Sequence, residues 1–421
     1  MNFNLGGLSC NDCGEVFICS IGLSNKRTIQ KFFVTCKNCE AQSFITLDVQ
    51  SRKISYDGLV QDKDKKNPLD YKRGLRLHLD FPVFDTPGWV PLSPFMISSM
   101  ISSDKSIGLH SKNTHLLNVL SENKREIKNI FKFYKNNNWK PLIKNSLNIY
   151  KKLHPYTSAP DLPSLKTREN DDNITKGFFF IDVLNMLQEP FLDIGKNEET
   201  YLNDEQHLKQ IFSSSNLPEL FSTLKNDNFF DTQISDINKI YISLLNHEEI
   251  LRPALFLVNS GINDENNKKK NPFKISIEDF NSISDIFKNI TEVLSRSLTF
   301  VIGVNNINMR GDFNKFHNNK INTISEYSKL DLATKLKYVD DTWFKNEIKS
   351  LDNRIRNSIA HFNWDFDEKD QNIYFYYKNS GLKRGRNKKL NLVDYIIKLI
   401  ESFRAMHRLN LIYLSVKINI S

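Results

Sequence analysis

The stretch LDNRIRNSIAHF, residues 351–362, combines an apolar stripe with a polar cluster at helical spacing. At about 100° per residue, one narrow face of a helix collects the apolar side chains of Ile348, Leu351, Ile355, Ile359 and Phe362. Arg356, Asn357 and His361 fall on the opposite side. The pattern therefore predicts a helix whose apolar face packs into a core, while an arginine and a histidine share the face that points away from it.

These two side-chain types suit the cleavage of RNA without a metal ion. The reaction needs a base for the 2′-hydroxyl, an acid for the leaving oxygen and a cation for the charge that builds on the phosphate. Histidine titrates near neutral pH and serves the first two roles, while arginine is a permanent forked donor for phosphate. Arg356 and His361 are five positions apart, so they flank the polar face. We therefore expect two copies of the helix to form a composite cleft about a two-fold axis.

The arrangement of Arg356, Asn357 and His361 resembles the motif of HEPN superfamily ribonucleases, in which an arginine and a polar residue precede a histidine on a helix. The resemblance covers about residues 275–421. It implies a small up-and-down helical bundle, usually dimeric, with catalytic Arg356 and His361 and a supporting Asn357. It also implies metal-independent endoribonuclease activity of the kind found in toxins and in abortive-infection, or antiviral-defence, effectors. The alternative for these residues is an exposed arginine and a histidine that N-caps or packs near a helix end.

The C-terminal third of the chain is expected to be a helical unit with one interruption. Helices are expected over about 276–301, 325–362 and 391–418, of which the second is either continuous or broken once. The interruption, Asn372–Tyr377, is an aromatic strand-like run. A segment with six cations and no acid follows it. We expect this segment to be a mobile loop that binds RNA phosphates through Lys383, Arg384, Arg386, Lys388 and Lys389. The aromatic rings either stack on bases or form one buried and one exposed face of a strand.

Four of the five cysteines form two matched pairs near the N-terminus, Cys10-x2-Cys13 and Cys36-x2-Cys39. A Cys-x2-Cys turn places two thiolates on one side of a knuckle, and two knuckles together supply the tetrahedron that structural zinc prefers. We therefore expect a closed, non-catalytic Zn²⁺ site in a small β zinc ribbon, with strands over 15–21, 31–35 and 42–49. The alternatives are free buried cysteines or an iron–sulfur cluster, and Cys19 is expected in the core.

The remaining sequence predicts a mainly α protein of four consecutive domains. The expected domains are a zinc ribbon over 1–56, a mixed and then helical region over 57–160, a helical regulatory or sensor domain over 161–272, and the HEPN-like ribonuclease domain over 273–421. The boundaries follow a proline-rich, charged linker at 154–173 and a polar, lysine-rich loop at 263–272.

Charge and hydropathy set the expected partners and location. The net charge of +9 favours a polyanionic partner, although a lysine-rich surface alone would also produce it. No run of about 18 apolar residues or secretion signal is evident, so we expect a cytoplasmic protein without a membrane span. The expected partners are an RNA substrate, a second copy of the chain, and a trigger or inhibitor. The alternative functions are a non-catalytic nucleic-acid-binding regulator or adaptor, which uses the ribbon and basic loop, and a purely structural interaction protein.

Overall fold

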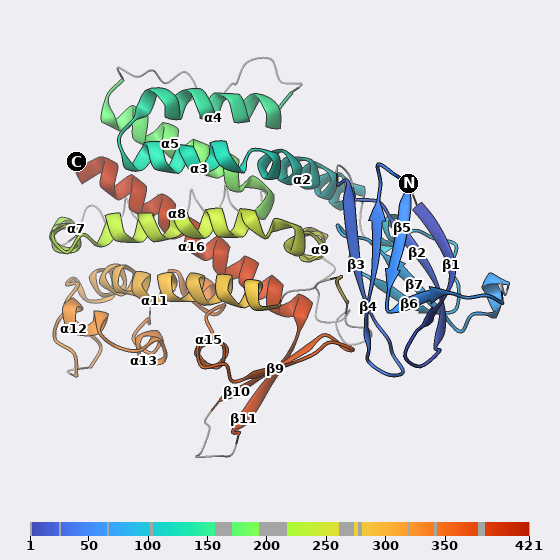
Figure 1. Ribbon diagram of the computed structural model, residues 1–421. Helices are drawn as coiled ribbons and strands as arrows, with labels where there is room; N and C mark the ends of the chain where they lie inside the picture. The colour runs from blue at the N-terminus through green and yellow to red at the C-terminus, as the bar shows by residue number, and fades with distance from the viewer. Residues whose placement is uncertain are drawn as a thin grey trace. The chain divides into compact units, whose positions relative to one another are not determined.

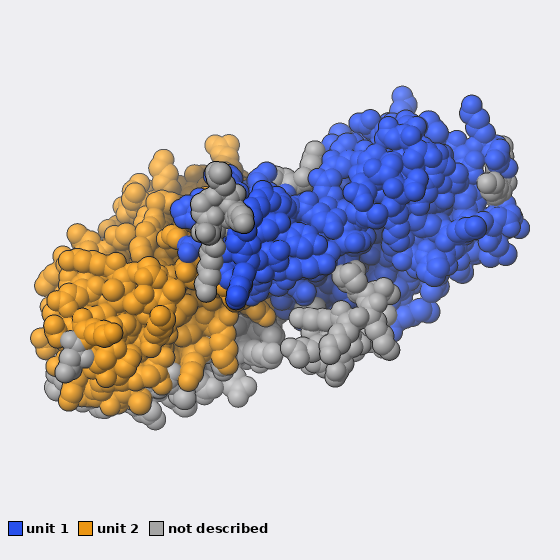
Figure 2. Space-filling view, turned by 90° about the horizontal axis from the view of Figure 1, so that it is seen from below, with its two compact units in different colours: residues 1–114, 247–283, 357–397 blue, residues 115–246, 284–356, 398–421 orange. Residues whose placement is uncertain are grey.

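The computed structural model describes residues 2–24, 27–64, 67–101, 104–155, 171–192, 217–260, 273–276, 280–318, 320–340, 343–377 and 384–420. The chain forms two compact units, each of which gathers three stretches that are distant in sequence (Figure 2). Unit 1 contains residues 1–114, 247–283 and 357–397, and unit 2 contains residues 115–246, 284–356 and 398–421. No helix among the described residues has the length and apolar character needed to cross a membrane.

Two β-sheets at the N-terminal end of unit 1 pack face to face (Figure 1). The five-stranded sheet has the order β6-β1-β2-β7-β8, with β1 (Asn2–Cys10), β2 (Val16–Gly22), β6 (Leu59–Gln61), β7 (Arg73–Leu77) and β8 (Phe84–Pro87). The three-stranded sheet has the order β3-β4-β5, with β3 (Ile29–Thr35), β4 (Gln42–Asp48) and β5 (Lys53–Asp57). Alternate residues of β3 and β4, such as Phe32 and Ile45, meet Phe17 and Leu75 of the larger sheet in one buried core.

The expected fold class, a mainly α chain with a small N-terminal zinc ribbon, is wrong. The described residues include eleven strands in three sheets, and the N-terminal sheet alone has five. The strands expected over 15–21, 31–35 and 42–49 are confirmed as β2, β3 and β4. The short strands β6, β7 and β8 have no alternation long enough to recognise, and β7 pairs with the distant β2 in parallel. Their pairing depends on contacts that a local pattern does not contain.

The rest of unit 1 consists of helices and a third sheet. Its described elements are α1 (Pro94–Ile101), the first part of α2 (Asp104–Glu122), α9 (Glu248–Asn259) and the sheet β11-β10-β9, formed by β9 (Trp364–Asp367), β10 (Asn372–Tyr377) and β11 (Arg386–Asn391). Residues 273–276 connect the sheets, because the Phe33 N–H donates to Ser276 Oγ at 2.7 Å and the Ile275 N–H donates to Gln371 Oε1 at 2.9 Å. The strand expected at Asn372–Tyr377 is confirmed as β10.

Unit 2 is a helical assembly. Its longer described elements are α3 (Lys124–Lys135), α4 (Trp139–Leu153), α5 (Asn173–Gln188), α7 (Leu217–Asn226), α8 (Phe229–Asn246), most of α11 (Phe280–Arg310) and most of α16 (Leu392–Ile420) (Figure 1). Aromatic rings join these helices, since Tyr413 of α16 lies 5.7 Å from the ring of Phe230 on α8 and 5.4 Å from that of Phe300 on α11.

The helix expected over 325–362, continuous or broken once, is also wrong, because the segment forms four short helices. These are α12 (Ile324–Ser328), α13 (Leu332–Leu336), α14 (Lys345–Ile348) and α15 (Asn353–Ala360). N-cap side chains start new helices inside the segment: Asp331 accepts from the Thr334 N–H at 3.1 Å, and Asp352 accepts from the Arg354 N–H at 3.0 Å. The apolar periodicity across these breaks therefore belongs to several short helices and not to one long helix.

Three buried histidines make the stability of the fold sensitive to acid. Burial lowers the pKa of His78 and of His110 to about 4 and that of His407 to about 3. In the unfolded chain these imidazoles bind protons below about pH 6.5. Between about pH 6.5 and 4 the unfolded chain therefore binds more protons than the folded chain, and the free energy of unfolding falls as pH drops.

We expect His110→Phe to reduce this acid sensitivity. The ring of His110 packs against Phe81 and Phe256 at 4.8 and 4.9 Å, so phenylalanine keeps the aromatic contacts and removes one titrating group. The slope of unfolding free energy against pH should fall by about 1.4 kcal/mol per pH unit in this window. Urea unfolding at several pH values measures the slope, and His317→Phe at an exposed histidine is the control. A slope equal to that of the wild type would contradict the assignment.

Candidate functional site

The four paired cysteines meet at one point of the β-sandwich. Their sulfur atoms all lie within 4.8 Å of one another, with Cys10 Sγ 3.7 Å from Cys39 Sγ and Cys13 Sγ 3.5 Å from Cys36 Sγ. A disulfide requires about 2.05 Å, whereas thiolates about 2.3 Å from a shared tetrahedral ion lie roughly 3.8 Å apart. The predicted cluster is therefore confirmed as a site with metal-binding geometry. Cys19 lies in the sandwich core, as expected, where burial raises the pKa of its thiol to about 12.

The two knuckles have the same backbone conformation, which explains how they present their sulfurs. In the first, the Gly14 N–H donates to Cys10 O at 2.9 Å, and in the second, the Glu40 N–H donates to Cys36 O at 3.1 Å. Gly14 and Glu40 both have left-handed backbones, with φ of 74° and 65°. One knuckle follows β1 and the other follows β3, so a metal ion would cross-link the two sheets of the sandwich.

The predicted catalytic residues lie on or directly after helix α15. Arg356 is half-buried, and its Nε donates to Glu292 Oε1 of α11 at 2.6 Å. Asn357 is half-buried, and His361 is exposed directly after the last helical residue. A rise of about 1.5 Å per residue separates Arg356 from His361 by roughly 7.5 Å along the axis. Glu292, which lies 64 residues before Arg356, has no signal in the local sequence that would have identified it.

The end of α15 determines how His361 is presented. The Asn363 N–H donates to Ser358 O at 2.8 Å and the Phe362 N–H donates to Ile359 O at 3.2 Å. This pair of hydrogen bonds is a Schellman motif in which His361 is the C-cap residue. Phe362 takes the left-handed position, at φ 53°, that glycine usually occupies. Its ring is 83% exposed.

The apolar stripe predicted for this segment is correct only in its middle. Leu351, Ile355 and Ile359 are buried, as expected. Phe362 leaves the core because the helix ends before it, and Ile348 belongs to the separate helix α14. The stripe therefore covers α15 and the residue just before its N-cap.

The basic segment is a strand in the part that the structure describes, not the loop expected from the sequence. Arg386, Lys388 and Lys389 belong to β11, Arg384 lies just before it, and Lys383 lies outside the described residues. Strand β10 buries Ile373 and Phe375 on one face. The opposite face, which we call the tyrosine–cation face, carries Tyr374 with Lys389 Nζ 5.6 Å from its ring, and Tyr376 with the Arg384 guanidinium 4.7 Å from its ring.

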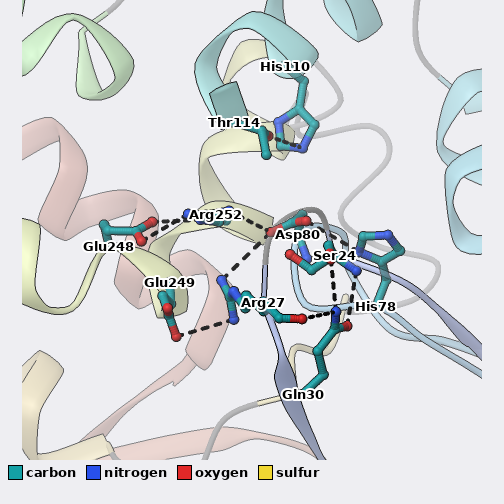
Figure 3. Close-up of polar contacts among 10 residues, drawn as sticks. All are labelled: Ser24, Arg27, Gln30, His78, Asp80, His110, Thr114, Glu248, Glu249 and Arg252. Atoms are coloured by element: carbon teal, nitrogen blue, oxygen red, sulfur yellow. Dashed lines mark hydrogen bonds and ion pairs between the residues drawn. The ribbon is translucent and has the colours of Figure 1, made fainter. Parts of the chain in front are cut away.

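A buried network of charged side chains in unit 1 was not expected from the sequence (Figure 3). Arg252 of α9 donates to Glu248 through Nε at 2.6 Å and Nη2 at 2.9 Å, and to Asp80 through Nη1 at 3.1 Å. Arg27 lies 3.2 Å from Glu249 and 3.8 Å from Asp80. Burial by itself would raise the pKa of Asp80, but Arg252, together with His78 and Arg27, holds it below its usual range. None of these residues lines either described cavity, so we assign the network to stability.

Comparisons of the chain with protein-family models, with curated proteins and with solved structures found no match. The chemistry assigned to the residues above therefore depends on their own geometry and on the spacing of the arginine and histidine motif.

We expect the cysteine cluster to retain about one metal ion per chain after purification. Cys39→Ser replaces an exposed ligand with a poor one, so the metal content and the thermal midpoint should both fall. Elemental analysis measures the metal, and Cys19→Ala should leave the content unchanged because Cys19 is not in the cluster. A Cys39→Ser protein with full metal content would contradict the four-cysteine site.

We expect Arg252→Met to destabilise the protein by about 3–5 kcal/mol, because it leaves Glu248 buried without its hydrogen-bonded cation and leaves Asp80 with the more distant Arg27. Arg296→Met is the matched control, since Arg296 forms a half-exposed pair with Asp236 that should contribute at most about 1 kcal/mol. Urea midpoints with a common slope compare the two variants. Equal midpoints for both would show that the network contributes nothing beyond a surface pair.

Proposed function

We propose that this chain is a metal-independent endoribonuclease whose active groups are Arg356 and His361, with Asn357 in support. The observation that carries the proposal is that the helix end with the exposed His361 is hydrogen-bonded to a strand whose surface is suited to RNA. The Tyr376 N–H donates to Asn363 O at 2.8 Å, and the Ser358 hydroxyl donates to Tyr376 O at 2.6 Å. These bonds hold the C-terminal end of α15 against β10, which carries the tyrosine–cation face.

Each group has a defined task in this proposal. His361 accepts the proton of a 2′-hydroxyl, whose oxygen attacks the adjacent phosphorus to form a 2′,3′-cyclic phosphate. The departing 5′-oxygen takes a proton from an imidazolium, and a guanidinium stabilises the charge on the phosphate. Tyr374 and Tyr376 stack on bases, and Lys389 and Arg384, which also pairs with Asp365, contact phosphates from the same face. Lys388 and Arg386 pair with Phe375 and Tyr377, so they lie on the other face of the sheet.

A homodimer completes the proposed site. Within one helix, His361 lies about 140° around the axis from Arg356, so the two side chains of one chain do not converge on one phosphate. A two-fold arrangement of α15 helices places the arginine of one chain near the histidine of the other. Arg356 then exchanges the carboxylate of Glu292 for the phosphate. In cells, such a dimer would act as a toxin or a defence effector that degrades RNA.

The cysteine cluster has a separate, structural role in this proposal. We propose that its metal is Zn²⁺, because Zn²⁺ in structural sites prefers a tetrahedron of thiolates. Four protein ligands leave no open position for a substrate, so the site is not catalytic. The elemental analysis of the purified chain distinguishes zinc from iron.

One observation favours a non-catalytic alternative. The Arg356 guanidinium already pairs with Glu292, so a chain in which that pair persists would bind RNA through the tyrosine–cation face without cleaving it. The same experiment separates the two functions.

We expect Arg356→Ala and His361→Ala each to lower RNA cleavage at least about 100-fold while changing RNA affinity little. End-labelled RNA, with an oligonucleotide that lacks 2′-hydroxyls as a second substrate, measures cleavage by the full-length protein. The controls are Arg354→Ala on the same helix and His317→Ala at an exposed histidine. Cleavage of the substrate without 2′-hydroxyls, or unchanged rates in both variants, would overturn the mechanism. RNA binding without cleavage by the wild type would support the alternative.

A further inference from the structure

Unit 2 contains a cavity of about 940 Å³ that the proposed nuclease chemistry does not use. Helices α3, α5, α8 and α16, together with the start of α4, form its walls. The volume lies within the range of about 300–1,000 Å³ that small-molecule sites occupy. Its wall carries six lysines, namely Lys128, Lys132, Lys135, Lys176, Lys239 and Lys417.

The charge around this cavity is strongly unbalanced. Asp231 is the one carboxylate among the described lining residues, and it pairs with Lys417. Lys239 pairs with Asp236 at 2.7 Å. For Lys128, Lys132, Lys135 and Lys176, the described part of the chain supplies no carboxylate within ion-pair distance. Lysines that line one cavity with few carboxylates create a positive potential there, which a polyanion would neutralise.

The packing of the helices explains why these lysines line the same cavity. Lys128, Lys132 and Lys135 are spaced four and three residues apart, so they share one face of α3. On α5, Gly177 permits close packing, because a Cβ at this position would lie 2.4 Å from Ile418 Cγ1 of α16. Lys176 directly precedes Gly177, Lys417 directly precedes Ile418, and both lysines line the cavity. The lysine arrangement is therefore a product of the helix packing and not of a flexible tail.

The cavity also offers groups that suit an aromatic base. Trp139 lines it, with Lys176 Nζ 6.0 Å from the ring and Tyr134 in an edge contact at 6.0 Å. The ring of Tyr134 is itself held by a parallel stack on Phe180 at 3.6 Å. Asn238, on α8, has a buried Oδ1 that accepts no hydrogen bond from any residue that the structure describes. A buried amide oxygen without a donor is costly, and the amino group of a base would satisfy it.

We propose that this cavity is a binding site for a small nucleotide that carries two or three phosphates. The lysines of α3, α5 and α16 hold the phosphates, Trp139 stacks on the base, and Asn238 accepts a hydrogen bond from it. The site lies wholly within unit 2, and its residues are distinct from Arg356, His361 and the tyrosine–cation face. Binding there does not depend on whether the chain cleaves RNA.

Calorimetric titration of the full-length protein with ATP, GTP, CTP and UTP tests the proposal. We expect at least one of them to bind in the micromolar range and to weaken as salt rises. Tripolyphosphate and the matching nucleoside should each bind at least about tenfold more weakly than that nucleotide, because each carries only part of the recognised chemistry. Binding of all four nucleotides no tighter than tripolyphosphate would overturn the role of the base. The absence of binding by every nucleotide would overturn the site.

Variants locate the binding. We expect Lys132→Glu to reduce nucleotide affinity at least tenfold, because it replaces an attractive charge with a repulsive one. Lys144→Glu makes the same charge change at an exposed residue of α4 outside the cavity and should leave affinity within about twofold, once general screening is matched by salt. Trp139→Ala should remove the preference for nucleotide over tripolyphosphate, and Trp139→Phe should retain it. Equal losses in Lys132→Glu and Lys144→Glu, or an unchanged preference in Trp139→Ala, would place the nucleotide elsewhere.

Discussion

The pairing of Arg252 with two buried carboxylates is the constraint on which the packing of unit 1 depends. Glu248 and Asp80 are almost fully withdrawn from water, and an unpaired carboxylate in that position would be strongly destabilising. Asp80 lies 172 residues before Arg252 in the chain, so the ion pair holds α9 against the segment that follows β7. The rings of Phe81, His110 and Phe256 close around the same region. The position of α9 is therefore determined by charge pairing as well as by apolar burial.

The end of α15 shows how a helix terminus can expose side chains to solvent. A helix that continued past Ala360 would bury Phe362 on the stripe that holds Ile355 and Ile359. Instead, the Schellman hydrogen bonds stop the helix and turn the chain into β9. A bulky residue in the left-handed conformation costs about 1–2 kcal/mol, and its ring remains in solvent. Strain of this kind is often retained where a surface has a role in binding, and His361 is the adjacent residue.

The two units concentrate positive charge in different ways. In unit 1 the cations of the tyrosine–cation face lie over aromatic rings on an open strand surface, which suits a long and flexible polyanion. In unit 2 the lysines surround a cavity with one lining carboxylate among the described residues, which suits a compact anion. A net charge of +9 alone does not distinguish these two arrangements, whereas the shape of the surface around the cations distinguishes them.

The sequence by itself determined the features that depend on short spacing. The two Cys-x2-Cys pairs, the strand at Asn372–Tyr377 and the buried face of α15 were all readable, because each is encoded within a few residues. Only the tertiary structure decided the five-stranded sheet, the breaks between α12 and α15, the partner of Arg356 and the ion network around Arg252. The physical reason is that these features consist of contacts between residues tens to hundreds of positions apart. The local sequence shows little periodic pattern for strand pairing, for the burial of charge or for the gathering of lysines around a cavity. These contacts stabilise the protein only when distant segments meet.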